Sequence, residues 1–197
     1  MLPFLGHLSS HTIGVREKRA RSVVNYAETE EPEDLPHVAL LGVEQALPGP
    51  LYISNARFVE MMVQRPSTLT SRHIGMVVSV TEGAHPLPSS VRYVQEPFRD
   101  RVNEPEEIIV EALTRVVAAV QEFWTAPARS VARRGVLVHC SAGQNRSAAA
   151  ILAILLSSGL SAQGARDAVD GTSLDGWDKF VGESGERLRE IVLRRFP

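Results

Sequence analysis

The sequence predicts an α/β fold, in which a central, largely parallel β-sheet is flanked by helices. Short apolar runs of strand length alternate along the chain with longer segments whose apolar residues recur at helical spacing. One strand-like run, 74–80, is a nearly continuous apolar stretch, which is typical of a strand covered on both faces. The chain has 197 residues, of which 44% are hydrophobic, so we expect one domain with a substantial core.

The amino-acid composition argues against some classes of binding partner and of cellular location. The formal net charge of −2 gives no general argument for DNA or an anionic membrane, and we expect neither as a partner. The longest apolar run, 148–156, is far shorter than the ~20 residues that span a bilayer. A single cysteine excludes an intramolecular disulfide and suits a reducing compartment, so the expected location is cytoplasmic, with the nucleus as the alternative.

The first 35 residues are predicted to be a flexible N-terminal extension. The segment 26–36 is acidic, interrupted by proline and poor in apolar residues, which favours a linker. The chain start lacks the features of a signal peptide. We therefore expect one folded domain over 36–197.

The first half of this domain is predicted to alternate strands with one helix. Residues 37–47 and 50–54 are expected to be strands separated by a Pro-Gly-Pro turn. Residues 55–65 are expected to form a helix with Asn55 as its N-cap. The buried strand 74–80 follows.

A second strand and a long helix come next. Residues 91–98 are predicted to be a strand. The helix 104–124 is expected to have Asn103 as its N-cap, with Pro105 and three glutamates in its first turn. The segment 125–135 is basic and turn-like.

The last third of the chain contains the segment with the candidate functional residues. A short strand, 136–140, leads through a polar loop into the helix 147–159, which is apolar on all sides and is therefore expected to be buried. Gly159 is expected to end this helix. Residues 161–169 and 182–195 are predicted to be further helices. Between them, Trp177 and Phe180 are expected in the core.

The polar loop after strand 136–140 is predicted to bind an anion such as phosphate or sulfate. A strand–loop–helix unit directs backbone N–H groups at one point, and the helix N-terminus adds a positive partial charge. Gly143 leaves room for the anion, and the planar fork of Arg146 matches two phosphate oxygens. The same field favours the thiolate form of Cys140, to which Ser147 can donate a hydrogen bond.

These residues form the sequence HCSAGQNRS, 139–147, which we call the signature loop. It resembles the signature of the cysteine-dependent protein tyrosine phosphatases and is most similar to that of the dual-specificity phosphatases. The segment LPGPLYISNARFV, 47–59, resembles the start of their catalytic domain. The resemblance spans roughly residues 38–195. It implies a phosphatase-type α/β fold, with the signature loop between a strand and a buried helix.

The residues that match the motif receive the following expected roles. Cys140 is the nucleophile, Arg146 and the loop amides bind the phosphate, and Ser147 stabilises the sulfur. His139 is expected to orient the loop by hydrogen bonding. The expected substrate-binding residues are His139, Ser141, Ala142, Gly143, Gln144, Asn145 and Arg146. No cofactor is expected, and the six scattered histidines suggest no metal site.

The resemblance also implies a general acid on the loop that follows a strand and precedes the long helix. Asp100 is the first aspartate there, 40 residues before Cys140. This separation is longer than the family usually has, and the extra length is assigned to the loop 125–135. Glu96 and Glu104 are the competing carboxylates, and a solvated loop aspartate is the alternative interpretation of Asp100.

The expected function is a protein phosphatase for phosphotyrosine, with phosphoserine and phosphothreonine as a wider option. It would act on a phosphoprotein through a cysteinyl-phosphate intermediate. The alternatives are a phosphosite-binding protein without catalysis, an RNA 5′-triphosphatase or another non-protein phosphatase. Asn145 stands where dual-specificity enzymes commonly have serine, and RNA 5′-triphosphatase relatives share the asparagine. RNA is nevertheless the less expected partner. Uncharged residues at 141, 142, 144 and 145 count against a phosphoinositide.

Overall fold

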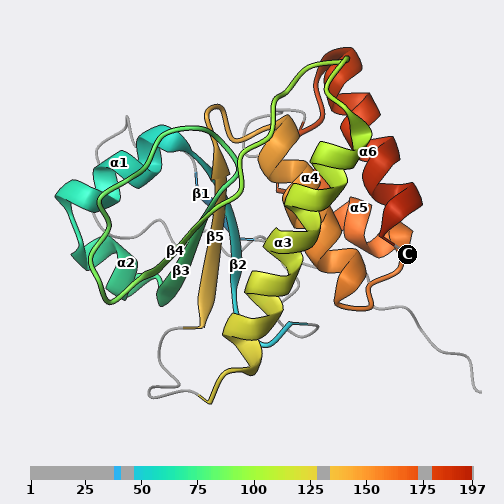
Figure 1. Ribbon diagram of the computed structural model, residues 1–197. Helices are drawn as coiled ribbons and strands as arrows, with labels where there is room; N and C mark the ends of the chain where they lie inside the picture. Colours follow the sequence, from blue (N-terminus) through green and yellow to red (C-terminus); the bar gives the residue numbers. More distant parts are fainter. Residues whose placement is uncertain (1–37, 41–46, 128–133, 173–178, 197) are drawn as a thin grey trace, which may run out of the picture.

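The structure is a computed structural model that describes residues 38–40, 47–127, 134–172 and 179–196. Its centre is a five-stranded sheet with the order β1-β2-β5-β3-β4 (Figure 1). β1 is antiparallel to β2, and the other neighbouring strands are parallel. The strands are β1 Val38–Leu40, β2 Leu51–Asn55, β3 Ile74–Ser79, β4 Arg92–Gln95 and β5 Gly135–Cys140. The largely parallel sheet expected from the sequence is confirmed.

Helices cover both faces of the sheet. Helices α1 and α2 lie on one face, and α3 to α6 lie on the other (Figure 1). The helices are α1 Ala56–Gln64, α2 Ser67–Ser71, α3 Glu106–Thr125, α4 Asn145–Ser157, α5 Ala162–Asp170 and α6 Gly182–Arg195. Among the described residues, no helix is both long and apolar enough to cross a membrane.

The sheet separates two hydrophobic cores. Because successive strand side chains point to opposite faces, Val136 and Val138 of β5 join the core under α3 to α6, while Leu137 joins the smaller core under α1 and α2. Every residue of β5 is buried. The strand that ends in Cys140 is therefore fixed on both faces and by hydrogen bonds to β2 and β3.

The buried helix after the signature loop is confirmed. In α4, every residue from Ser147 to Leu156 is buried, between the sheet and the helices α3, α5 and α6. It ends at Ser157, and Gly159 follows with a φ of 90°, a conformation that favours glycine. Phe180 joins the same core, as expected, whereas Trp177 lies outside the described residues.

Helix α1 begins as predicted, but α3 does not. The side chain of Asn55 accepts a hydrogen bond from the backbone N–H of Phe58, as an N-cap should. The predicted cap of α3, Asn103, is wrong: Pro105 occupies the cap position, and no side chain caps this helix. The backbone before Pro105 is already used in a turn, in which the N–H of Glu104 donates to the carbonyl of Arg101.

Two further differences concern short elements. Helix α2 was not predicted, because its five residues are mostly serine and threonine and give little periodic signal. The strand expected over 37–47 is observed only at Val38–Leu40, and residues 41–46 lie outside the described part. Residues 128–133 of the expected basic loop also lie outside it.

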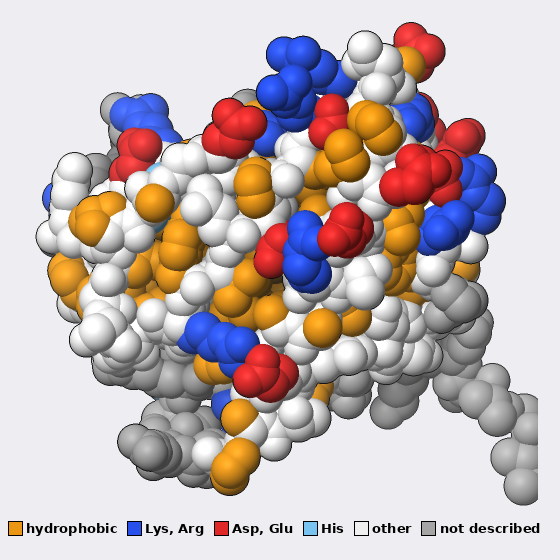
Figure 2. Space-filling model, in the orientation of Figure 1, with side chains coloured by type: hydrophobic (Ala, Val, Ile, Leu, Met, Phe, Trp, Pro, Cys, Tyr) orange, Lys and Arg blue, Asp and Glu red, His pale blue; other side chains and the backbone are white. Residues whose placement is uncertain are grey.

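Charges on the face that carries α3 are interspersed rather than segregated (Figure 2). Arg92 pairs with Glu122 at 2.7 Å, and Arg115 pairs with both Glu96 and Glu111. This mixture agrees with the small net charge of the sequence.

Candidate active site

The signature loop lies where three parallel strands end together. Cys140 is the last residue of β5, whose neighbours in the sheet are β2 and β3. Residues 141–144 then lead into α4, which begins at Asn145. The carboxyl edge of a parallel sheet is where open α/β folds bind their ligands. The predicted strand–loop–helix arrangement is therefore present, with the helix starting two residues earlier than expected.

The loop is held tightly against the end of β2. The backbone N–H of Ala56 donates to the carbonyl of Ser141 at 3.3 Å. Gly143 has a φ of 76°, and a Cβ atom there would lie 3.0 Å from the carbonyl oxygen of Ser54. Both the backbone conformation and the close approach therefore require glycine at this position.

The thiol of Cys140 lies beside the hydroxyl of Ser147. The two atoms Sγ and Oγ are 3.4 Å apart, and the cysteine is only 3% exposed. The Ser147 hydroxyl is also 3.0 Å from the carbonyl oxygen of Gln144, to which it donates in this conformation. Rotation of one O–H bond can turn that donor toward a thiolate.

Arg146 is fixed over the loop by three polar contacts. Its Nη1 donates to Thr81 Oγ1 at 3.2 Å and to the carbonyl of Phe98 at 3.3 Å, and its Nη2 donates to Ser141 Oγ at 3.1 Å. Its Nε is buried and has no hydrogen-bond partner among the described residues. The guanidinium thus keeps a donor available for an oxyanion.

Thr81 was not identified from the sequence. It follows β3, and its hydroxyl lies 3.1 Å from that of Ser141. The signal that could have found it is positional: a polar residue just after a buried parallel strand lies at the same edge of the sheet as the signature loop.

His139 is completely buried next to Cys140. Its ring packs edge-on against that of His85, with centroids 5.0 Å apart. Burial, assisted by His85, lowers the pKa of His139 to about 4. Neither ring nitrogen makes a hydrogen bond of good geometry within the described residues, while a weaker backbone contact with Cys140 partly opposes the lowering of the pKa. That His139 orients the loop by hydrogen bonding stays a prediction.

Asp100 lies against the signature loop despite its 40-residue separation from Cys140. Its carboxylate accepts hydrogen bonds from Asn145 Nδ2, at 3.0 Å to Oδ2 and 3.3 Å to Oδ1. The same loop brings the carbonyl of Phe98 to Arg146. The exposed Asp100 is thus hydrogen-bonded to the residue that precedes Arg146.

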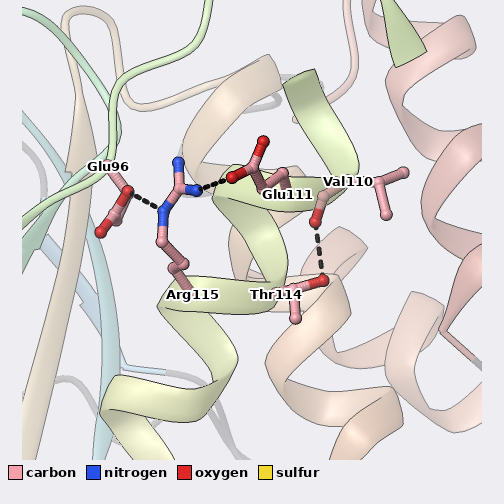
Figure 3. Close-up of polar contacts among 5 residues, drawn as sticks. All are labelled: Glu96, Val110, Glu111, Thr114 and Arg115. Carbon is pink, nitrogen blue, oxygen red and sulfur yellow. Dashed lines mark hydrogen bonds and ion pairs between the residues drawn. The ribbon is translucent and has the colours of Figure 1, made fainter. Parts of the chain in front are cut away.

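The carboxylate of Glu96, one competitor of Asp100, is occupied elsewhere. It accepts a hydrogen bond from Arg115 Nε at 2.6 Å, and Arg115 also donates to Glu111 at 2.5 Å (Figure 3). Figure 3 also shows a hydrogen bond within α3, in which the hydroxyl of Thr114 donates to the carbonyl of Val110 one turn earlier. Glu96 therefore joins the start of the Asp100 loop to α3.

Two more features near the site were not expected from the sequence. The carbonyl of Glu104 accepts a hydrogen bond from Arg187 of α6 at 2.7 Å, which fixes the far end of the Asp100 loop. Lys179 is partly buried, and this burial lowers its pKa, while the charge of Cys140 opposes the shift. Within the described residues, no group of three or more His, Cys, Asp or Glu side chains could hold a metal ion.

Comparison with known proteins adds evidence at the level of structure. No family model matches the sequence, and no curated protein matches it. The structure is similar to human DUSP28, with a TM-score of 0.55 and 19% identity, over 73% of this chain and 91% of the other. It is also similar to a mouse putative dual specificity phosphatase complexed with zinc tungstate, with a TM-score of 0.57 and 20% identity, over 84% of this chain and 90% of the other.

A third similar structure is OH1 from the Orf virus, described as a tyrosine phosphatase with triple substrate specificity. Its TM-score is 0.54 at 17% identity, over 74% of this chain and 82% of the other. The chain therefore has the fold of the dual-specificity and tyrosine phosphatases. The fold that the signature loop implied is confirmed.

Proposed function

We propose that this chain is a cysteine-dependent phosphomonoesterase that acts on phosphoproteins. One observation carries the proposal: the Cys140 thiol, the Arg146 guanidinium and the Asp100 carboxylate each make a hydrogen bond with a residue of the signature loop, namely Ser147, Ser141 and Asn145. Nucleophile, anion binder and proton donor are the three groups that phosphoryl transfer from an ester needs.

In the first step, the Cys140 thiolate attacks phosphorus and an S–P bond forms. The bond between phosphorus and the ester oxygen breaks, and Asp100 gives its proton to the leaving oxygen. The products are a cysteinyl-phosphate and the free alcohol or phenol of the substrate. Arg146 and the loop amides stabilise the phosphoryl oxygens, where charge develops.

In the second step, water attacks the cysteinyl-phosphate. The Asp100 carboxylate accepts a proton from the water, the S–P bond breaks, and the electron pair returns to sulfur. Ser147 donates a hydrogen bond to the departing thiolate. Inorganic phosphate leaves, and Asp100 is again protonated for the next cycle.

The proposed substrate is phosphotyrosine, with phosphoserine and phosphothreonine as further substrates. The printed names of the similar structures, which are dual-specificity and tyrosine phosphatases, support this choice. The asparagine that suggested an RNA substrate has another explanation, because the Asn145 side chain is buried and bonded to protein groups. The contact to Asp100 also favours catalysis over mere phosphosite binding.

The remaining expectations complete the proposal. We propose that residues 36–197 form the catalytic domain and 1–35 an extension, and that residues 139 and 141–146 line the phosphate site. A cytoplasmic or nuclear location is proposed from the single cysteine, which suits a reducing compartment.

The decisive test is the substitution Cys140→Ser. Turnover of p-nitrophenyl phosphate is expected to fall at least roughly 1,000-fold, because a serine hydroxyl is a far weaker nucleophile than a thiolate. Binding of inorganic phosphate, measured by calorimetry, should persist because the loop amides and Arg146 remain. The matched control Ser71→Ala, at an exposed position of α2, should keep full activity. Undiminished turnover by Cys140→Ser would refute the mechanism.

A further inference from the structure

We propose that Asn145 is a positioning residue that holds Asp100 in place for proton transfer, and that it is itself held by the start of α6. This inference rests on the proposed function. It gives a role in the reaction to a side chain that the sequence offered only as a hint about the substrate.

The hydrogen bonds of Asn145 determine how its amide group is oriented. The backbone N–H of Val181, just before α6, donates to Asn145 Oδ1 at 2.7 Å. Because a backbone N–H is only a donor, the oxygen of the amide must face Val181. The Nδ2 group is then left to donate, and it reaches the Asp100 carboxylate at 3.0 and 3.3 Å.

The α6 side of Asn145 has further contacts that fix it. Nδ2 also lies 3.1 Å from the carbonyl of Val181 and 3.4 Å from Ser184 Oγ. The side chain is 8% exposed and packs against the backbone of α6, where a Cβ atom on Gly185 would lie only 2.6 Å from Asn145 Oδ1. The amide is therefore ordered before any substrate binds.

Asp100 gains from this contact because it has little other support. It is exposed and lies on the segment between β4 and α3, which has no regular secondary structure. A carboxyl group on such a segment samples many orientations, and misplacement by about 1 Å can reduce a rate on the order of 100-fold. A donor on the rigid first turn of α4 restricts those orientations.

The chemistry of the first step fits an amide donor in particular. When Asp100 gives its proton to the leaving oxygen, it becomes a carboxylate, and hydrogen bonds to a charged acceptor are stronger than those to a neutral one. An amide carries no ionisable proton, so Asn145 stabilises the product form of the acid without competing for the proton. A serine at 145 has a shorter side chain and could not bridge Val181 and Asp100 in the same way.

The test uses a series of aryl phosphates whose leaving phenols range from acidic to weakly acidic. With a working general acid, kcat/KM depends only weakly on the acidity of the phenol. In Asn145→Ala, turnover of the substrate with the least acidic phenol should fall roughly 10- to 100-fold more than turnover of the substrate with the most acidic phenol. Asn145→Ser should behave similarly, and it serves as the second variant if Asn145→Ala does not fold.

A double mutant distinguishes positioning from a general structural effect. If Asn145 acts through Asp100, adding Asn145→Ala to Asp100→Asn should steepen the leaving-group dependence no further. The matched control Gln163→Ala changes an exposed side chain of α5 that donates a hydrogen bond to Asp167. Its leaving-group dependence should match that of the wild-type chain.

The two proposals fail in different ways. An equal loss on every substrate in Asn145→Ala, or a steepening that adds to that of Asp100→Asn, would overturn the positioning role and leave the proposed function intact. If the wild-type chain showed no turnover, or Cys140→Ser turned over as fast, the proposed function would fall and the positioning role with it.

Discussion

Two adjacent residues of the signature loop, Asn145 and Arg146, direct their side chains to different parts of the molecule. Arg146 contacts Thr81, Ser141 and the Asp100 loop, and it keeps a donor free for an oxyanion. Asn145 is directed to Asp100 and α6 instead. Neighbours on a helix point about 100° apart, so in the proposed mechanism the start of α4 would contact the phosphate on one side and the proton donor on the other.

The buried His139 predicts how the stability of the folded chain depends on pH. Its pKa in the folded chain is about 4, below the value of about 6.5 for an unperturbed histidine, because the ring is buried beside His85. Between these two pH values the unfolded chain binds more protons than the folded chain. The stabilising contribution of neutral His139 is therefore complete above pH 6.5 and is lost as pH falls toward 4, by at most roughly 3 kcal/mol.

Urea unfolding at several pH values between 7 and 4 measures this effect. The variant His139→Leu cannot be protonated, so its free energy of unfolding should fall less steeply over the same interval. Other groups titrate in both proteins and cancel in the comparison. Parallel pH profiles for the two proteins would contradict the assignment.

At the scale of elements, the site depends on how α6 meets the start of α4. The polar contacts of Val181 and Ser184 with Asn145 form at the first turn of α6, and Arg187 one turn later reaches the carbonyl of Glu104. Helix α6 thus touches both the signature loop and the segment that carries Asp100. The first half of α6 supports the signature loop and the segment between β4 and α3, in addition to covering the core.

Gly185→Ala tests this support. Replacing glycine by alanine within a helix usually stabilises it by up to about 1 kcal/mol. Here the new Cβ would lie 2.6 Å from Asn145 Oδ1 and 2.9 Å from the backbone of Phe180. We therefore expect the free energy of unfolding to fall by roughly 1–3 kcal/mol.

The measurement is chemical denaturation, with Glu190→Ala at an exposed position of α6 as the control. The double variant Gly185→Ala with Asn145→Ala should recover part of the loss, because one of the two close contacts is removed. Stabilisation by Gly185→Ala alone would show that α6 does not pack against Asn145 in this way.

In the whole molecule, one helix, α4, both lies at the centre of the core and forms the end of the signature loop. It contacts β5, α3, α5 and α6, so it lies at the centre of the larger core. Its first residues form the end of the signature loop, and its remaining residues are almost all buried aliphatic side chains. The packed core around α4 holds the signature loop in one conformation.

Leu152→Ala should show this dependence. Leu152 is completely buried in the middle of α4, and its truncation is expected to lower the free energy of unfolding by about 2–5 kcal/mol. The matched control Gln163→Ala, exposed on α5, should change it by less than about 0.5 kcal/mol. Thermal or urea unfolding measures the stability of both variants. Equal stability of the two would contradict the central position of α4.

The local sequence determined the elements that depend on local signals. The strand run before Cys140, the apolar helix after it and the cap at Asn55 were all predictable, because hydrophobic periodicity and capping residues act over a few positions. Cys140 and Arg146 could be proposed as site residues for the same reason, since they lie six residues apart in one motif.

Only the tertiary structure decided how distant segments meet this loop. The contacts of Arg146 with Thr81 and Phe98, of Asn145 with Asp100 and Val181, and of Glu96 with Arg115 join residues 19 to 65 positions apart. The cap expected at Asn103 failed because a turn and Pro105 already fix the backbone there. Such contacts depend on the packing of helices against the sheet, which no local sequence pattern encodes. This packing brings Asn145 within hydrogen-bond distance of Asp100.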